Sequence, residues 1–207
     1  MSTRFATIRE LQLALDAGKT TAVELTEQAL ARIEDPKGQG ATAFINVYKE
    51  QALASARASD ILRQAGLARS ALEGIPISIK DLFDYKGDVP RGASALLKDA
   101  PAATEHATLV QRLLEAGAII IGRTNMTEFA FSGLGINPHY GTPKSPWNRD
   151  VGHIPGGSSS GAGVSVSDGM SVAAIGTDTG GSIRIPSAFC GITGFKPTAA
   201  RIPSEGV

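Results

Sequence analysis

The 207-residue sequence is poor in several residue types, and each scarcity excludes a class of protein. Its single cysteine, Cys190, excludes a disulfide framework and a multi-cysteine metal site, and is typical of a reducing compartment such as the cytoplasm. The 20 basic and 20 acidic residues cancel, so the chain lacks the basic excess expected of nucleic-acid binding or a polybasic membrane anchor. No apolar run reaches the roughly 18 residues of a transmembrane helix. We expect a globular protein that binds neither nucleic acid nor membrane.

Glycine is the residue in excess, and it is concentrated in one segment. Of the 24 glycines, 11 lie between positions 152 and 194, together with 8 serines and only three charged residues. Apolar residues such as Val164, Ile175 and Phe189 are interspersed there, which a flexible linker would lack. The segment therefore indicates closely packed backbone that approaches something at short range.

Residues 1–66 predict a mainly helical region that packs on the rest of the chain. Two Thr-x-x-Glu patterns, beginning at Thr7 and Thr21, have the spacing of capping boxes and precede apolar stripes. A short strand is predicted over 44–48, followed by an alanine-rich helix over 49–65.

Residues 67–207 have the pattern of an α/β core. A strand over 75–80, a helix over 104–116 and a buried strand over 118–121 form a βαβ-like unit. A further strand is predicted over 172–175. We therefore expect an α/β fold.

The candidate catalytic residues are serines, as nucleophiles, and one lysine, as a base. Ser158, Ser159 and Ser160 lie in a Gly-Gly-Ser-Ser-Ser-Gly segment, but a serine is a poor nucleophile without a base. None of the three histidines lies in a pattern typical of a hydrolase or a zinc site. Lys80, at the end of an apolar strand, is a base if burial lowers its pKa. Alternatively it is a surface residue paired with Asp81, which the pattern alone favours.

The turn at residues 176–182 is a candidate anion site. Its successive backbone N–H groups, next to Ser182, have the arrangement that stabilises an oxyanion during acyl transfer. A phosphate loop and a plain turn are the alternatives. Phosphate binding is less favoured, because the lysine of a Walker loop and the spacing of a dinucleotide fingerprint are both missing.

Four ordered segments resemble the amidase signature family: GIPISIKD at 74–81, GRTNMTEFA at 122–130, GGSSSG at 156–161 and GTDTGGSIRIPSAFCG at 176–191. The similarity extends from about residue 7 to the end of the chain. It implies a mixed β-sheet flanked by helices, and an amidase that hydrolyses carboxylic amides through an acyl-enzyme, releasing ammonia or an amine. No metal or cofactor is implied.

The resemblance also implies a Ser-cisSer-Lys triad. Ser182 would be the nucleophile and Lys80 the ultimate base. The two serines of the family are 24 residues apart, a separation that here selects Ser158 as the relay. The peptide bond before Ser158 would be cis.

Further roles follow from the same resemblance. Backbone N–H groups would form the oxyanion hole, and two residues would line the acyl pocket. Asp178 and Arg184 are expected to be a structural pair, and Cys190 to be a packing residue. The implied oxyanion-hole residues are Thr179, Gly180, Gly181 and Ser182, and the implied substrate-binding residues are Ala130 and Ser132.

Members of that family are considerably longer and close their sheet with a C-terminal half. We therefore expect an incomplete sheet at the C-terminus, and as partners a small-molecule amide together with a second copy of the chain or a C-terminal half. Two alternatives remain open. One is the glutaminase (A) subunit of a glutamyl-tRNA amidotransferase, and the other is an inactive fragment or scaffold relative.

Overall fold

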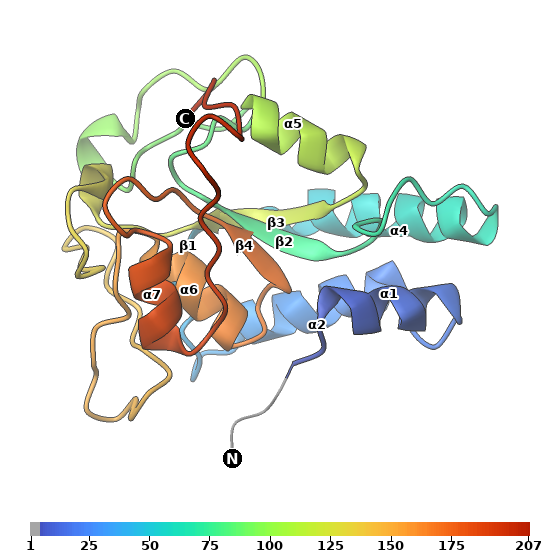
Figure 1. Cartoon of the computed structure of the whole chain (residues 1–207), viewed down its shortest axis with the longest axis horizontal. Helices are drawn as coiled ribbons and strands as arrows, with labels where there is room; N and C mark the ends of the chain where they lie inside the picture. Colours follow the sequence, from blue (N-terminus) through green and yellow to red (C-terminus); the bar gives the residue numbers. More distant parts are fainter. Residues whose placement is uncertain (1–4) are drawn as a thin grey trace.

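The computed structural model describes residues 5–207, so the first four residues of the predicted helical region lie outside it. Its centre is a four-stranded sheet with strand order β1-β3-β2-β4 (Figure 1). β1 is antiparallel to β3, whereas β3, β2 and β4 are parallel, so the expected mixed sheet is confirmed. The strands are β1 (Phe44–Val47), β2 (Pro76–Lys80), β3 (Ile119–Thr124) and β4 (Ala173–Ile175).

The N-terminal helices form where their start signals predict them. Thr7 and Thr21 each accept a hydrogen bond from the backbone of the glutamate three residues later, and both capping boxes are complete. One short helix was not predicted, because its four residues are too few to show a helical period. The helices are α1 (Ile8–Asp16), α2 (Ala22–Glu34), α3 (Gly40–Ala43) and α4 (Lys49–Gln64).

The predicted βαβ unit is confirmed as β2, α5 (Thr108–Glu115) and β3. α5 begins later than predicted, and β3 continues past Ile121 to Thr124. The extension of β3 includes Arg123 and Thr124, which are buried although they are polar. A search for apolar runs ends the strand too early, because these side chains are buried by hydrogen bonding rather than by apolar contacts.

Apolar clusters lie on both faces of the sheet. Ile119 and Ile121 pack with α6 (Ser160–Ser167) through Val164, while Ile77 and Ile120 pack with Val110 of α5. Figure 1 shows α5 above the sheet and α6 below it. Short 3₁₀ turns occur at Ala95–Leu97 and Glu128–Ala130.

The glycine-rich segment forms two helices, α6 and α7 (Arg184–Cys190), which the sequence pattern does not predict. A side chain at Gly161 would collide with the backbone of Asn125, and one at Gly163 would lie 3.1 Å from Cys190 Sγ. Glycine therefore lets α6 lie directly against its neighbours, as expected for closely packed backbone.

Between residues 5 and 207, none of the helices is both long and apolar enough to cross a membrane.

Candidate active site

Lys80 lies at the carboxyl end of β2 and is completely buried. Its Nζ donates to Ser158 Oγ at 2.7 Å and to Thr177 Oγ1 at 2.7 Å. The interpretation that Lys80 is a surface residue paired with Asp81 is therefore wrong. It failed because a strand that is buried along its whole length leaves no solvent-exposed end for the lysine.

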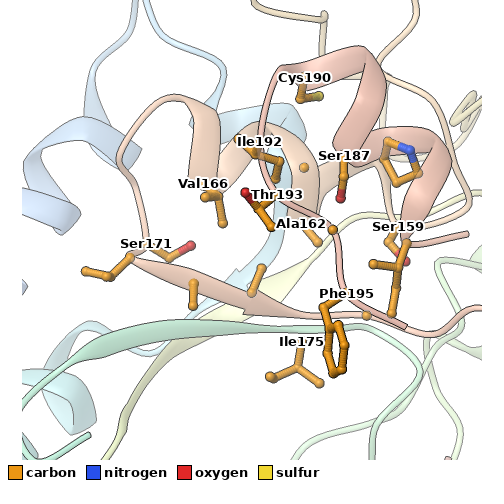
Figure 2. A pocket seen from close by; sticks show the side chains of 18 of the residues that line it. Ser159, Ala162, Val166, Ser171, Ile175, Ser187, Cys190, Ile192, Thr193 and Phe195 are labelled. Atoms are coloured by element: carbon orange, nitrogen blue, oxygen red, sulfur yellow. The ribbon is translucent and has the colours of Figure 1, made fainter. Parts of the chain in front are cut away.

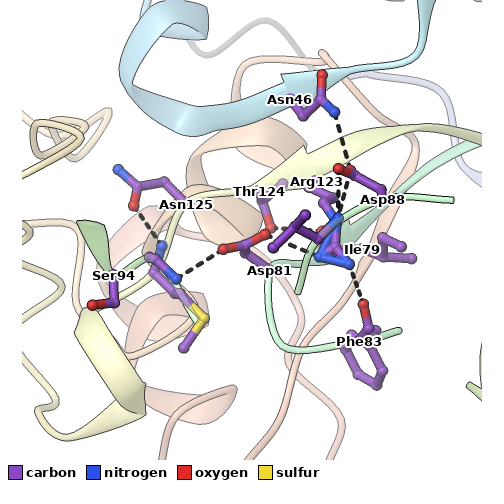
Figure 3. A network of polar contacts seen from close by, with 12 residues as sticks. Asn46, Ile79, Asp81, Phe83, Asp88, Ser94, Arg123, Thr124 and Asn125 are labelled. Atoms are coloured by element: carbon purple, nitrogen blue, oxygen red, sulfur yellow. Dashed lines mark hydrogen bonds and ion pairs between the residues drawn. The ribbon is translucent and has the colours of Figure 1, made fainter. Parts of the chain in front are cut away.

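Asp81 is engaged elsewhere, in the polar network of Figure 3. Its carboxylate accepts from Arg123 at 3.0 Å and from the backbone N–H of Ala93 at 2.8 Å, and both charged side chains are fully buried. Arg123 also donates to the Phe83 carbonyl and lies 3.2 Å from Asp88. The network fixes the chain directly after Lys80. Burial raises the pKa of Asp81 to about 6, although Arg123 opposes the shift.

Burial also controls the charge of Lys80. Removal from water disfavours the ammonium form and lowers the lysine pKa to about 7, against a smaller opposing effect of Asp178. A lysine with this pKa is largely a neutral amine in mildly alkaline solution. It can then accept a proton from a neighbouring hydroxyl.

The peptide bond between Gly157 and Ser158 is cis, as the resemblance implies. The segment is held by the loop at 127–135. Thr127 N–H donates to the Ser158 carbonyl at 3.0 Å, and Gly157 N–H donates to the Gly133 carbonyl at 2.8 Å. A side chain at Gly157 would lie only 2.6 Å from Gly135 N, so this close approach requires glycine.

Ala130 and Ser132 lie on the same loop, beside the serine segment. Ala130 has a left-handed backbone, with φ of 58°. The Ser132 hydroxyl accepts from Leu134 N–H at 3.1 Å. The bonds of Thr127 and Gly133 to the serine segment hold the loop that carries these two residues against it.

Asp178 organises the turn at residues 176–182. Its carboxylate accepts from the N–H groups of Gly181 at 2.8 Å and Ile183 at 3.2 Å, and it forms an ion pair with Arg184 at 2.9 Å. The hydrogen bond from Arg184 holds the pKa of Asp178 well below its ordinary range. The expected structural pair is thus present, and it engages one of the four N–H groups proposed for an oxyanion hole. Within the described part of the chain, the N–H groups of Thr179, Gly180 and Ser182 have no acceptor.

Ser182 is half-buried and is joined to the serine segment through the backbone. Ser159 N–H donates to the Ser182 carbonyl at 3.2 Å. Considering residues 5–207, no hydrogen bond links the hydroxyls of Ser158 and Ser182. The structure thus brings Lys80 into direct contact with both Ser158 and Thr177, while Ser182 joins this group through its backbone bond to Ser159. Hydrogen bonds between catalytic groups are often long before substrate binds.

A hollow of about 1280 Å³ lies along β4, α6, α7 and the chain that follows α7. Figure 2 shows Ala162, Val166 and Ile175 around it, with Phe195 at its rim. Ser159, Thr177 and Asp178 are also in its lining, whereas Lys80, Ser158 and Ser182 are not. The hollow is therefore mainly apolar and reaches the edge of the polar site.

Cys190 on α7 packs as expected. It is buried, its Sγ donates to the Pro155 carbonyl at 3.5 Å, and burial raises the pKa of the thiol to about 12. A thiol with this pKa is inert as a nucleophile. Among the described side chains, no cluster of histidine, cysteine or acidic residues could hold a metal ion.

The fold and the site together define an α/β protein with a buried lysine–serine pair at the carboxyl ends of its parallel strands. A family model described as Amidase matches residues 24–207. The chain belongs to the amidase family.

Similar proteins of known name or structure support this assignment. The glutamyl-tRNA(Gln) amidotransferase A-subunit of Chromohalobacter salexigens is 44% identical over 97% of this chain, which spans 40% of that protein. The native peptide amidase of Stenotrophomonas maltophilia superposes with a TM-score of 0.89 at 34% identity, over 98% of this chain and 42% of that one. A chain from a vestigial complex linked to the origins of an s-triazine catabolic enzyme superposes with a TM-score of 0.91 at 38% identity, over 97% and 43%. The chain thus spans about 40% of the length of such curated relatives.

Proposed function

We propose that the protein hydrolyses carboxylic amides through an acyl-enzyme. Ser182 Oγ attacks the carbonyl carbon while its proton passes to Ser158, whose own proton passes to the neutral amine of Lys80. The carbon–nitrogen bond breaks, and the leaving nitrogen takes the proton back along the same path. Water, deprotonated by the same relay, then cleaves the ester and restores Ser182.

The charge that develops on the carbonyl oxygen needs donors that are not otherwise engaged. We assign this role to the N–H groups of Thr179, Gly180 and Ser182, which have no acceptor within residues 5–207. Gly181, the fourth donor implied by the resemblance, uses its N–H to bind Asp178 and so holds the turn in shape. We place the acyl side of the substrate against Ala130 and Ser132, because their loop is bonded to the serine segment.

One observation carries this proposal: the 2.7 Å contact between Lys80 Nζ and Ser158 Oγ, with both residues completely buried. A fully charged lysine at such a place would be costly, and a neutral lysine there is a base in contact with a proton donor.

A fluorophosphonate probe tests the proposal without knowledge of the substrate. Attack by Ser182 forms an oxygen–phosphorus bond and expels fluoride, so intact-mass and peptide mass spectrometry should find the adduct on Ser182. Ser182→Ala should abolish the adduct, and Lys80→Ala should slow it by several orders of magnitude. Absence of labelling in the wild-type chain, or equal labelling of Lys80→Ala, would refute the mechanism and favour a scaffold without catalysis.

A second candidate function is the glutaminase subunit of an amidotransferase. The observation that favours it is the 44% identity to the amidotransferase protein of Chromohalobacter salexigens. Ammonia release from glutamine, together with stable co-purification of a partner subunit, would favour this role. Hydrolysis of simple aliphatic or aromatic amides by the chain alone would favour a free-standing amidase. In either case the single thiol, Cys190, suits the cytoplasm.

A further inference from the structure

Thr177 has no assigned role, yet it touches the proposed base. It follows β4, and β4 pairs with β2, so its position in the next turn brings it beside Lys80 at the end of the neighbouring strand. The distance from Thr177 Oγ1 to Lys80 Nζ is 2.7 Å, equal to that between Lys80 and Ser158. Lys80 Nζ thus has two hydroxyl neighbours at hydrogen-bond distance.

The backbone on both sides of Thr177 is fixed. A side chain at Gly176 would lie 2.7 Å from Ser159 Oγ, so glycine lets this turn approach the serine segment closely. Ser159 Oγ donates to the Thr177 carbonyl at 3.4 Å. On the other side, the Asp178 carboxylate is bound to Gly181 N–H and to Arg184. The backbone that carries the Thr177 side chain is therefore held in place by its neighbours.

The two contacts of Lys80 must differ in direction when the lysine acts as a base. A neutral amine has two hydrogens and one lone pair. To receive the Ser158 proton, the lone pair must point at Ser158, which leaves the hydrogens for other acceptors. Between residues 5 and 207, Thr177 Oγ1 is the only other hydrogen-bond partner of Nζ.

We propose that Thr177 is a positioning residue for Lys80: its hydroxyl accepts an Nζ hydrogen and thereby turns the amine lone pair toward Ser158. This inference rests on the proposed role of Lys80 as the base. The contact persists after proton transfer, when Thr177 stabilises the ammonium that has formed. Asp178 is the charged group that acts on Lys80 in this setting, because the Asp81 carboxylate is bound to Arg123.

The matched variants Thr177→Val and Thr177→Ser test the inference. Valine preserves the shape and removes the acceptor, whereas serine retains the hydroxyl. Thr26→Val is the control, because the Thr26 hydroxyl is fully buried on α2 and has no hydrogen-bond partner among residues 5–207. For each variant, the Lys80 pKa is measured from the ¹³Cε shift of labelled lysine, with Lys80→Met to assign the signal. The rate of fluorophosphonate labelling of Ser182 is measured against pH.

A hydrogen bond to a charged group is strong enough that its loss should lower the Lys80 pKa by about one unit or more in Thr177→Val. The half-maximal pH of labelling should fall with it, and the plateau rate should drop about tenfold or more, because the lone pair is no longer oriented. Thr177→Ser should keep the Lys80 pKa and the labelling profile close to those of the wild type. Thr26→Val should change neither the pKa nor the profile.

The two proposals fail in different ways. An unchanged Lys80 pKa in Thr177→Val would overturn the role of Thr177, whether or not the wild type is labelled. Absence of wild-type labelling would instead count against the proposed function. A loss of labelling in Thr177→Val with no change in pKa and no rescue by serine would also reject positioning, because a packing defect has that signature. If Thr177→Val does not fold, Thr177→Ala provides the same comparison with serine.

Discussion

The buried amine of Lys80 makes the stability of the protein depend on pH in a definite direction. In the unfolded chain the lysine has a pKa near its ordinary value of 10.5, and in the folded chain burial lowers the pKa to about 7. Between these values the unfolded state holds a proton that the folded state has released. The free energy of unfolding therefore rises with pH across this window.

The magnitude follows from the two pKa values. Each pH unit over which a whole proton separates the two states contributes about 1.4 kcal/mol. From pH 7 to pH 9 the folded lysine goes from half-protonated to almost fully neutral, while the unfolded lysine stays charged. Lys80 should thus contribute about 2 kcal/mol of added stability over these two units.

Urea unfolding followed by circular dichroism at pH 7, 8 and 9 measures this effect, with Lys80→Met as the perturbation. Methionine approximates the shape of the lysine stem and cannot titrate. The titration of Cys190 lowers the free energy of unfolding above about pH 8.5, because burial raises the pKa of the folded thiol to about 12. It is present in both proteins, so the difference between wild type and variant isolates Lys80.

Lys49→Met is the matched control. Lys49 is exposed and pairs with Glu34, which raises its pKa, so it stays charged in both states from pH 7 to 9. The free energy of unfolding of Lys49→Met should therefore change with pH as that of the wild type does. The corresponding curve for Lys80→Met should lose the rise between pH 7 and pH 9. If the Lys80→Met and wild-type curves are parallel as well, Lys80 is not a neutral amine at mildly alkaline pH, and the proposed proton transfer loses its base.

Other substitutions probe the same region. Ser158→Ala should reduce fluorophosphonate labelling by several orders of magnitude and Ser159→Ala far less, because of these two serines only Ser158 bonds to Lys80. The reverse order of labelling rates would make Ser159 the relay. Arg123→Met should cost about 3–5 kcal/mol of unfolding free energy, since the buried Asp81 carboxyl group loses its cationic partner. Urea denaturation measures this, and a loss below about 1 kcal/mol would contradict the burial of the pair. Asp178→Ala should slow labelling while leaving the secondary structure intact, because the turn loses its anchor; an unchanged rate would show that the turn does not need the carboxylate.

The predictions from sequence succeeded where local chemistry decides the structure. The capping boxes at Thr7 and Thr21 need only residues three apart, and both form. The alternating isoleucines of β2 likewise indicate a strand without reference to the rest of the chain.

α6 escaped prediction for a physical reason. Most of this helix is buried, so it has no polar face and shows no apolar stripe. Its glycines and serines are poor helix formers, and here close packing against α3 and α7 replaces propensity. Packing against its neighbours stabilises such a helix, so the pattern of its own residues does not predict it.

The site, too, combines features that local sequence reveals with features that depend on packing. The spacing of Ser158 and Ser182 is visible in the sequence, but the state of Lys80 is not, because the pattern of β2 does not reveal what covers its end. Burial decided between the two interpretations of this lysine. Thr177 was missed because a lone threonine before an aspartate has no distinguishing pattern; its role depends on a contact across 97 positions of chain.

The position of the site in the sheet explains why these distant residues meet. β2, β3 and β4 are parallel, so their carboxyl ends lie at one edge, where the chain leaves the sheet in turns. Lys80 ends β2, the turn at residues 176–182 follows β4, and β3 supplies Arg123, which binds the residue next to Lys80. Glycines then let the turns approach within contact distance of one another. A charged lysine would be unstable among such turns, and this instability is what makes the neutral, proton-accepting amine available.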